Sequence, residues 1–376
     1  MKIIVAPDSF KGSCSSENAA KCIKRAINKV NSTVDVVTMP IADGGEGMVE
    51  AIAGALPSKS VSCEVLDPIG RKITARYLVT ADGTAIIEMA RASGLTLLDK
   101  NKLNPLVTTT YGTGQLIKSA LNGGAEKLII GLGGSATNDA GAGVLQALGA
   151  SLKDSQGNEL PFGGAALHNL ASIDLSNFDS RIKNCDITMA CDVTNPLCGE
   201  FGATHIYGPQ KGVNSSTLPI LEAALSHFGK YTANLMNFEY STAPGSGAAG
   251  GLGFALSAFC GAKFASGIDI ILDICGFDKH LESASLVITG EGRIDSQSIY
   301  GKAVCGIAKR AQRQDIPVVV LAGSVDADIE KLYEIGITAA FSIMNEPNNL
   351  SYAIENVEPL LFAAAQNVVR LFLIGL

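Results

Sequence analysis

Strand-like and helix-like patterns alternate at both ends of the chain, and this split alternation most limits the possible folds. Near the N-terminus, apolar runs at residues 3–6 and 34–38 are each followed by a stretch with helical spacing. The alternation returns late in the chain, where apolar runs lie at residues 285–289, 317–322 and 338–344. Strands that alternate with helices are typical of a parallel sheet covered on both faces. We therefore expect one doubly wound α/β domain built from both chain ends.

The long middle region has a different pattern, so we expect a second domain there. Between about residues 61 and 89, short alternating runs are separated by the turn signals "PIG" and "ADG", which is typical of an antiparallel meander. Further strand, loop and helix units follow it. The expected division is 1–58 together with 284–376 for the doubly wound domain, and 59–283 for an inserted mixed α/β domain.

Composition and charge exclude several classes of protein. The 376 residues are 47% hydrophobic and 17% charged, which is typical of globular domains with large cores. A net charge of −7 argues against a basic face for nucleic acid. The nine cysteines form no CxxC pair, which favours reduced, mostly buried thiols. We expect a cytoplasmic protein.

Neither end of the chain has the pattern of a membrane segment. The N-terminal apolar run is too short for a signal peptide. The C-terminal run at residues 360–376 is interrupted by Gln366, Asn367 and Arg370, and it is shorter than the roughly 20 apolar residues that a span needs. We therefore expect no membrane partner.

Unusual polar stretches follow the strands of the split domain. "PDSFKGS" follows the first strand, "PIADGGEG" the second, "TGEGRIDSQ" the third and "AGS" the fourth. In open α/β sheets, ligands bind at the carboxyl ends of the strands. We therefore expect these stretches to converge on one face of the sheet, although they are far apart in the sequence.

The stretch "KLIIGLGGSATNDAGAG", residues 127–143, has an apolar strand that enters a glycine-rich loop and then a helix. Backbone N–H groups at such a turn bind anions, and glycine lets them approach a phosphate closely. Ser135, Thr137 and Asn138 can add hydrogen bonds. The loop suits a phosphate chain, but two alternatives stay open. Residues 131–136 fit the GxGxxA dinucleotide fingerprint, with Asp154 placed to meet a ribose, and a purely structural tight turn fits as well.

A second glycine run, "PGSGAAGGLG" at residues 244–253, precedes a helical pattern. It contains GxGxxG, but no strand comes directly before it, which weakens a dinucleotide interpretation. It is either a second anion-binding loop or a place of close helix packing. No GxxxxGK[ST] motif is present, so a P-loop NTPase is disfavoured.

Two stretches place carboxylates where they can act on a substrate or a metal. Asp192 and Asn195 follow the apolar strand "DITMA", and an aspartate there can accept a proton or hold a metal. The alternative is an Asx turn before Pro196. Asp43 and Glu46 lie among glycines in "ADGGEG", which suits Mg²⁺. The alternative there is the N-terminal cap of a helix.

Several cations lie in glycine-flanked stretches. "GEGRIDSQSIYGK" carries Arg293 and Lys302 together with Asp295, while Lys11 and Lys211 lie in "SFKGS" and "YGPQKG". Arginine and lysine bind carboxylates and phosphates. The alternative for the first stretch is a solvated surface loop. The four histidines lie in no metal-ligand motif, so zinc hydrolysis and histidine-based nucleophilic catalysis have little support.

Taken together, these motifs resemble the type I glycerate kinases. The matching stretches are "PDSFKGS", "ADGGEG", "GLGGSATNDAGAG", "CDVTNPLCG", "YGPQKG", "GAAGGLG" and "LVITGEGRIDSQS", in that order from residue 7 to about residue 298. The resemblance implies transfer of the γ-phosphoryl group of ATP to D-glycerate with Mg²⁺, usually giving 2-phosphoglycerate. It also implies two α/β domains with a cleft between them, one of them flavodoxin-like.

Given that reaction, the chemistry of phosphoryl transfer assigns roles to the candidate residues. The transfer needs positioning and charge neutralisation more than covalent chemistry. We expect Asp192 to be the base for the glycerate hydroxyl, and Lys11 and Arg293 to neutralise developing charge. The expected ligands of the ATP phosphates are Gly133, Gly134, Ser135, Asn138 and Asp139. The expected substrate contacts are Asp8, Ser9, Asn195, Lys211 and Lys302, and the expected Mg²⁺ ligands are Asp43, Glu46 and Asp295.

Other functions remain as alternatives. A kinase for another small hydroxy acid would use the same residues. A nicotinamide-dependent oxidoreductase would need a second strand at about 150–153, where the sequence is a poor strand. A solute-binding protein would bind its ligand without ATP. Arg91 lies where much of the family would have a small residue, and the sequence does not separate a monomer from a homodimer.

Overall fold

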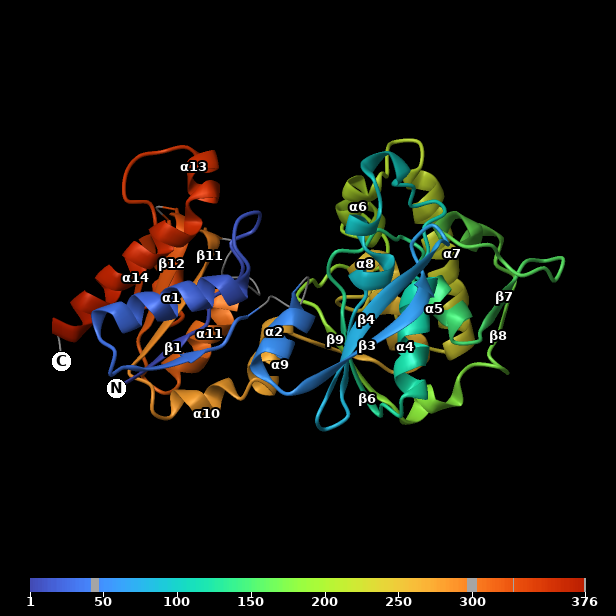
Figure 1. Cartoon of the computed structure of the whole chain (residues 1–376). Coiled ribbons are helices and arrows are strands. Elements are labelled where there is room, and N and C mark those ends of the chain that lie inside the picture. Colours follow the sequence, from blue (N-terminus) through green and yellow to red (C-terminus); the bar gives the residue numbers. More distant parts are fainter. Residues whose placement is uncertain (42–46, 296–302, 327, 375–376) are drawn as a thin grey trace. The chain divides into compact units, whose positions relative to one another are not determined.

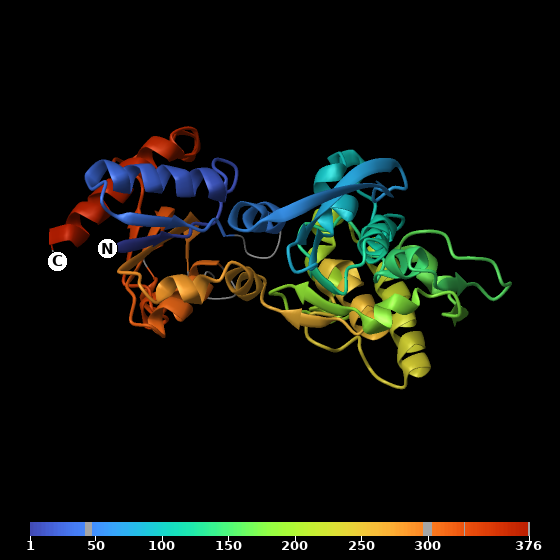
Figure 2. The same cartoon turned by 60° about the horizontal axis from the view of Figure 1, so that its bottom comes forward.

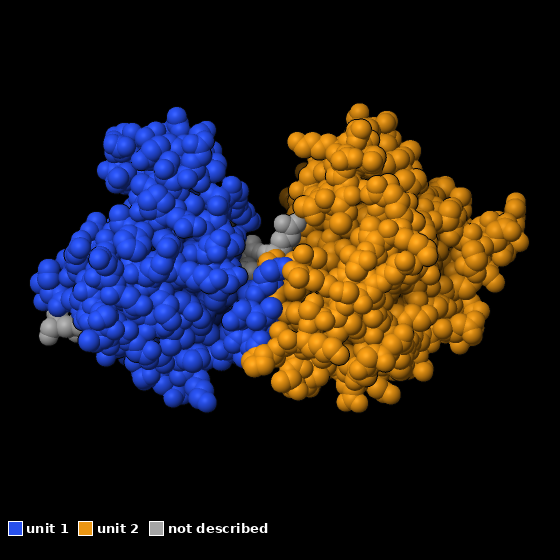
Figure 3. All heavy atoms as spheres, viewed as in Figure 1, with its two compact units in different colours: residues 1–43, 50–56, 266–376 blue, residues 44–49, 57–265 orange. Residues whose placement is uncertain are grey.

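The computed structural model describes residues 1–41, 47–295, 303–326 and 328–374 (Figure 1). Contacts divide the chain into two compact units, shown in different colours in Figure 3. Unit 1 contains Met1–Asp43, Glu50–Leu56 and Ser266–Leu376, and unit 2 contains Gly44–Val49 and Pro57–Ala265. From the sequence we expected the inserted domain to end at residue 283. In the structure, residues 266–283 belong to unit 1.

Unit 1 contains a five-stranded sheet in which every strand pairs in parallel with its neighbours. The order across the sheet is β13-β12-β11-β1-β2. In chain order this is 2-1-3-4-5, an order found in doubly wound sheets. The five strands predicted from the two chain ends are therefore confirmed. They are β1 (Lys2–Val5), β2 (Asp35–Thr38), β11 (Leu286–Ile294), β12 (Val318–Val325) and β13 (Ala339–Ser342).

Helices cover both faces of this sheet because strand side chains point alternately to the two sides. Leu321 packs in one apolar cluster with α1 (Ser16–Val30) and α14 (Val357–Ile374), and these two helices lie against each other in Figure 2. Val320 packs in another cluster with α11 (Ala303–Gln312) and α12 (Glu330–Glu334). Among the described residues, this unit also contains α9 (Gly267–Ile274), α10 (Phe277–Leu281) and α13 (Leu350–Glu355), and α2 (Met48–Ala55) is divided between the units.

Among the described residues, one helix, α14, is long and apolar enough to cross a membrane by length and composition. Its buried side chains include Leu361, Ala365 and Val369, which belong to the same apolar cluster as α1 and the sheet. Burial of this face explains the apolar composition of the helix as that of a core element.

Unit 2 contains a six-stranded mixed sheet in the order β10-β9-β6-β5-β4-β3. The expected meander is confirmed, because β3, β4 and β5 pair antiparallel. From β5 onward the pairs are parallel. The strands are β3 (Ser58–Leu66), β4 (Lys72–Thr80), β5 (Ala85–Glu88), β6 (Lys127–Gly131), β9 (Asp186–Ala190) and β10 (Lys263–Ala265).

The segment after the glycine-rich loop leaves the main sheet. β7 (Ser151–Lys153) pairs antiparallel with β8 (Ser172–Asp174) in a separate two-stranded sheet. Asp154 follows β7 in a tight turn, where it accepts hydrogen bonds from the backbone of Gln156 and Asn158. A dinucleotide-binding unit needs the next strand beside β6 in the same sheet. The fold therefore does not support the oxidoreductase alternative.

The helices of unit 2 pack around two apolar clusters. One cluster lies between the main sheet and the helices α4 and α8, and the other lies around α5, α7 and α8. Phe228 and Phe254 meet edge to face in the second cluster, with ring centroids 5.6 Å apart. The helices are α3 (Ala90–Ser93), α4 (Tyr111–Asn122), α5 (Ala142–Ala147), α6 (Ala203–Tyr207), α7 (Leu218–Met236) and α8 (Ala248–Cys260).

Candidate active site

In unit 2, three neighbouring strands carry the candidate residues at their carboxyl ends. β5, β6 and β9 are adjacent and parallel, so the segments that follow them leave the sheet at the same edge. The glycine-rich loop follows β6, and Asp192 lies two residues beyond β9. This edge is where open α/β sheets bind their ligands.

The glycine-rich loop offers a row of unpaired backbone donors. Among the described residues, the N–H groups of Gly133, Gly134 and Ser135 have no hydrogen-bond partner. Gly133 and Gly134 are partly exposed, and Gly134 has a φ of +73°, a conformation that favours glycine. Consecutive N–H groups in such a turn form a concave site for an anion. The loop thus has the donors that a phosphate requires.

Asp139 shapes this loop from inside the protein. Its carboxylate accepts hydrogen bonds from the backbone and hydroxyl of Thr110, at 2.8 and 2.9 Å, and from the backbone of Gly141 and Gly143, at 3.1 and 3.2 Å. The side chain is fully buried, which raises its pKa, while the four donors oppose that shift. We therefore assign Asp139 to the loop-to-helix turn and not to direct contact with a phosphate.

Asn138 is also fully buried, and its amide nitrogen donates to the hydroxyl of Thr204 at 3.0 Å. Of the five expected phosphate ligands, Gly133 and Gly134 are thus partly exposed, whereas Ser135 is buried like Asn138 and Asp139. The loop would meet a ligand with its backbone, while its side chains hold it in place.

The second glycine run packs directly behind the first loop. The backbone N–H of Ala140 donates to the oxygen of Gly250 at 3.0 Å. A Cβ atom at Gly250 would lie 2.0 Å from the oxygen of Thr137, and one at Gly251 would lie 2.6 Å from the Cα of Ala140. Of the two interpretations of this run, the geometry favours close packing.

Lys211 reaches the same region from a short 3₁₀ turn, Pro209–Lys211. Its Nζ atom donates to the oxygen of Thr137 at 2.7 Å and to Oγ of Ser135 at 3.3 Å. The residue is only 1% exposed. Burial lowers its pKa to about 7, and the charge of Asp139 acts in the opposite direction.

The loop after β9 is held by Asn195. Its Nδ2 donates to the oxygen of Phe201 at 2.8 Å, and its Oδ1 accepts from the hydroxyl of Tyr207 at 2.6 Å. Asp192, three residues earlier in the same loop, is exposed. Asn195 therefore holds the loop in which the exposed Asp192 lies.

In unit 1, the segments after β1 and along β11 enclose a pocket of about 340 Å³. The backbone N–H of Asp8 donates to the oxygen of Gly290, which joins the two segments. Phe10 and Cys14 exchange backbone hydrogen bonds, so Lys11 lies exposed in the tight turn between them. The pocket is lined by Asp8, Ser9, Lys11, Glu291, Gly292, Arg293 and Asp295.

Arg293 is a positively charged residue that lines this pocket. Its guanidinium is 3.0 Å from a carboxylate oxygen of Asp326 and 3.6 Å from one of Asp295. The side chain remains 62% exposed. The pocket therefore contains both cations and carboxylates, a mixture suited to a ligand with acidic groups and a bound cation.

Comparison with known proteins identifies the family. The sequence model described as the glycerate kinase family matches residues 3–373. The chain belongs to the glycerate kinase family. The resemblance inferred from the motifs is therefore confirmed, and the protein is a phosphotransferase.

Named relatives match this chain over nearly their whole length. Glycerate 2-kinase of Escherichia coli is 45% identical over 377 residues, covering 100% of this chain and 99% of the relative. Glycerate kinase of Bacillus subtilis is 46% identical over 369 residues, covering 98% and 97%. The crystal structure of a putative glycerate kinase 2 from Salmonella typhimurium LT2 has a TM-score of 0.88 at 43% identity, covering 100% of this chain and 99% of that one.

Three of the expected site residues, Asp43, Glu46 and Lys302, lie outside the described residues. Among the residues that are described, no group of three His, Cys, Asp or Glu side chains could hold a metal. Mg²⁺ usually takes one or two protein carboxylates and completes its shell with water and phosphate oxygens. The carboxylates that line the unit 1 pocket, with Asp295 among them, fit that requirement.

Glu88, the last residue of β5, is a candidate site residue that the sequence patterns did not indicate. Its Oε1 accepts from the backbone N–H of Gly47 at 2.9 Å and of Val49 at 3.0 Å, at the start of α2. Its Oε2 accepts from Nε of Arg91 at 2.7 Å. The two bonds to the start of α2 connect residues about 40 positions apart, so no local pattern reveals them.

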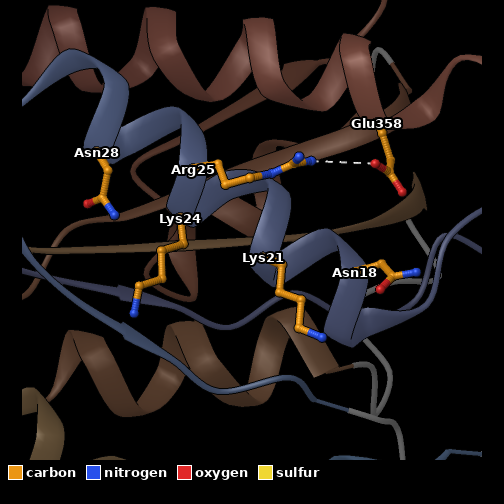
Figure 4. Close-up of a pocket in the computed structure, with 6 residues that line it drawn as sticks. All are labelled: Asn18, Lys21, Lys24, Arg25, Asn28 and Glu358. Carbon is orange, nitrogen blue, oxygen red and sulfur yellow. Dashed lines mark hydrogen bonds and ion pairs between the residues drawn. The ribbon is translucent and has the colours of Figure 1, made fainter.

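A second hollow, of about 470 Å³, lies along α1 and is basic (Figure 4). Its cations are held by the protein itself: Lys21 pairs with Glu17, Lys24 donates to a backbone oxygen, and Arg25 lies 3.5 Å from Glu358. Both members of the Arg25 pair are at least half exposed. This hollow is the solvated face of a helix, and we assign it no ligand.

Proposed function

We propose that this chain transfers the γ-phosphoryl group of ATP to the 2-hydroxyl of D-glycerate, giving 2-phospho-D-glycerate and ADP. The observation that carries the proposal is the row of N–H groups at Gly133, Gly134 and Ser135, between a strand and a helix, which have no hydrogen-bond partner in the part of the chain that the structure describes. Such a row binds the phosphates of a nucleotide. The acceptor is taken from the named relatives, one of which is a glycerate 2-kinase.

The proposed acceptor chemistry uses one exposed base. Asp192 accepts the proton of the glycerate hydroxyl as the oxygen attacks the γ-phosphorus, because an exposed carboxylate beyond a strand end is open to a small substrate. Asn195 and Tyr207 orient the loop that carries it.

The proposed charge neutralisation uses the unit 1 pocket. Lys11 and Arg293 compensate the negative charge of the glycerate carboxylate or of the phosphoryl group. Asp8 and Ser9 line the same pocket and are proposed substrate contacts. Lys302 remains a proposed contact from the sequence.

Mg²⁺ is the proposed metal, and Asp295, together with Asp43 and Glu46, would hold it. A bound Mg²⁺ supplies positive charge that stabilises the phosphate oxygens during transfer. Arg293, which lies 3.6 Å from Asp295, orients that carboxylate. Asp295 would therefore be presented in a fixed direction before any ligand arrives.

The proposed setting is the cytoplasm, with no nucleic-acid or membrane partner. All nine cysteines are free thiols, as expected for a reducing compartment. We further propose that unit 1 is a flavodoxin-like domain, since its strand order is the order of that fold. Its pocket then lies among the loops at the carboxyl ends of the strands, where such domains bind ligands.

The test is release of ADP by the purified protein from ATP with Mg²⁺, with and without D-glycerate. L-Glycerate, glycolate and D-lactate serve as matched acids that change one feature of the substrate at a time. We expect release that requires both D-glycerate and Mg²⁺ and that stops when EDTA is added. Release with another acid in place of D-glycerate would change the substrate and keep the mechanism. No release with any acid would contradict the proposal.

A further inference from the structure

Lys211 occupies an unusual position for a lysine. It is 1% exposed, so a ligand in solution does not reach its ammonium group. Lysine is almost never fully buried, because removing its charge from water is unfavourable. Burial accordingly lowers its pKa to about 7. Burying this lysine lowers the stability of the protein, and residues that lower stability often serve its function.

The backbone at Lys211 is also held by neighbouring groups. Its own N–H donates to the oxygen of Gly208 at 2.9 Å. The next residue, Gly212, has a φ of +97°, and a Cβ atom there would lie 2.7 Å from the oxygen of Leu103. The turn therefore holds Lys211 in one place, and its side chain can transmit that fixed position to the group that it contacts.

The groups that Lys211 contacts are parts of the glycine-rich loop. Its ammonium donates to the oxygen of Thr137 and to the hydroxyl of Ser135. The same hydroxyl also accepts from the N–H of Thr137 at 3.2 Å and lies 3.3 Å from the oxygen of Ala249. Ser135 thus lies at the centre of a small network that ties the loop to the second glycine run.

The network lies directly behind the donors of the loop. Ser135 provides one of the three N–H groups of the loop that lack a partner among the described residues, and Gly133 and Gly134 provide the other two. A loop of glycines has many accessible conformations, so aligned donors need an external restraint. The hydrogen bonds from Lys211 supply that restraint at two points next to the donors.

We propose that Lys211 is a positioning residue that fixes the Ser135–Thr137 segment, so that the N–H groups of Gly133, Gly134 and Ser135 point at the ATP phosphates. It does so without touching the nucleotide. Both the ammonium and the neutral amine donate hydrogen bonds, so the restraint depends on the donor and not on the charge. This inference rests on the proposed function, because it deepens the role of the same loop.

The test compares two substitutions that separate the donor from the charge. Lys211→Met fills the same space without a donor, and Lys211→Gln keeps a donor without a charge. We expect Lys211→Met to raise KM for ATP about tenfold or more, because two acceptors of the loop lose their donor at once, and to change KM for D-glycerate less than twofold. Lys211→Gln should recover most of that loss.

A purely structural role would give a different pattern. Both KM values would then be unchanged, or both would change together in the two variants. Either result would overturn the inference. Thermal unfolding of the wild type and of each variant shows whether all of them are folded at the temperature of the kinetic assays.

A second variant covers the case in which Lys211→Met does not fold. Ser135→Ala removes one of the two acceptors of the lysine, and Ser135→Thr keeps the hydroxyl. We expect Ser135→Ala to raise KM for ATP and to change KM for D-glycerate less than twofold, whereas Ser135→Thr should stay closer to the wild type. A Ser135→Ala variant with an unchanged KM for ATP, or with equal changes in both KM values, would overturn the inference.

Calorimetric titration with Mg-ATP separates this inference from the proposed function. A wild-type protein without glycerate-dependent ADP release would contradict the proposed function. The titration would still show whether Lys211→Met weakens nucleotide binding about tenfold, as the inference requires. Equal affinities for the wild type and Lys211→Met would overturn the inference even in an active kinase.

Discussion

Asp139 and Asp192 each follow a parallel strand of unit 2, yet their surroundings give them different tasks. Asp139 is fully buried and accepts four hydrogen bonds, so its oxygens are occupied by the protein. Asp192 is exposed in a loop that Asn195 holds in place. A carboxylate that must accept a proton from a substrate needs access, and that requirement favours Asp192 as the base.

Removing the charge of Asp192 tests its role. We expect Asp192→Asn to lower kcat by about 100-fold or more, because the amide cannot accept the hydroxyl proton. The thermal unfolding midpoint should change little, since substitutions of exposed residues usually have small effects on stability. Steady-state kinetics with saturating ATP measures the effect.

Asp186→Asn is the matched control for this substitution, because Asp186 is an exposed residue at the opposite end of the same strand, β9. It should keep normal turnover. An Asp192→Asn variant with turnover close to that of Asp186→Asn would remove Asp192 from the mechanism.

The buried lysine gives a prediction for stability as a function of pH. The pKa of Lys211 is about 7 in the folded protein, against 10.5 for an ordinary lysine. Between these values the unfolded chain binds more protons than the folded one, so raising the pH stabilises the wild type relative to Lys211→Met. The difference should grow by at most about 1.4 kcal/mol per pH unit.

Urea unfolding of both proteins at pH 6.5 and pH 9 measures this difference. Other titrating groups, including the nine cysteines, are common to both proteins and cancel in the comparison. Parallel stability curves over this range would show that Lys211 titrates normally, in contradiction to its burial.

At the scale of elements, the sequence predicted best what a regular pattern encodes. The apolar runs identified all five strands of unit 1, and the alternating runs identified the meander of unit 2. β11 was predicted to end at residue 289 but continues to Ile294. Its polar extension is strand because it pairs with β12, with Arg293 opposite Ser324. Such pairing is set by a partner strand and leaves no periodic pattern of its own.

The candidate site was predictable to the extent that its residues lie in local motifs. The stretches after β1, β6, β9 and β11 were identified because each follows an apolar run. The supporting contacts were not, since Glu88 meets the start of α2 and Asp139 meets Thr110 only in the folded chain. The sequence also did not show which residues are buried. Lys11 and Lys211 both lie in glycine-containing stretches, yet Lys11 is exposed and Lys211 is buried.

Gly250, within α8, and Gly261, which caps the C-terminal end of α8, test the packing of the two glycine runs. Gly250 and Gly261 have nearly the same φ, +68° and +66°. A Cβ atom at Gly250 would lie 2.0 Å from the oxygen of Thr137, whereas one at Gly261 would meet nothing within 4 Å. Gly261→Ala should therefore cost only the left-handed strain, about 1–2 kcal/mol.

Gly250→Ala should cost clearly more than that and should also raise KM for ATP, because the loop that bears the donors must move. Chemical denaturation and steady-state kinetics on both variants measure these effects. Equal losses of stability, together with normal kinetics for Gly250→Ala, would show that the two runs do not depend on each other.

At the scale of the whole molecule, each unit has its own sheet and its own apolar clusters. Unit 1 is further held by Arg310 of α11, whose side chain is 8% exposed and contacts three aspartates of α9 and α10, namely Asp269, Asp273 and Asp278. Those helices are the part of unit 1 that the sequence assigned to the inserted domain. The arginine therefore fixes them to the doubly wound sheet.

Replacing this arginine should weaken unit 1 selectively. We expect Arg310→Met to lower its stability by about 1–3 kcal/mol, between the values for exposed and buried ion pairs, because three carboxylates lose a shared cation. Hydrogen exchange should become faster in peptides from β11 and β12 and stay unchanged in peptides from β6 and β9.

Arg25→Met is the control within the same unit, because Arg25 forms an exposed pair with Glu358. It should change stability by less than about 1 kcal/mol. Equal exchange for the two variants would contradict a bracing role for Arg310.

The central claim is that D-glycerate receives a phosphoryl group on its 2-hydroxyl. Proton-coupled ³¹P NMR of the product of ATP, Mg²⁺ and D-glycerate tests both the acceptor and the position. We predict a phosphomonoester signal split into a doublet by the single hydrogen on C2. A triplet from the two hydrogens on C3 would contradict the position, and the absence of any new phosphomonoester signal would contradict the claim as a whole.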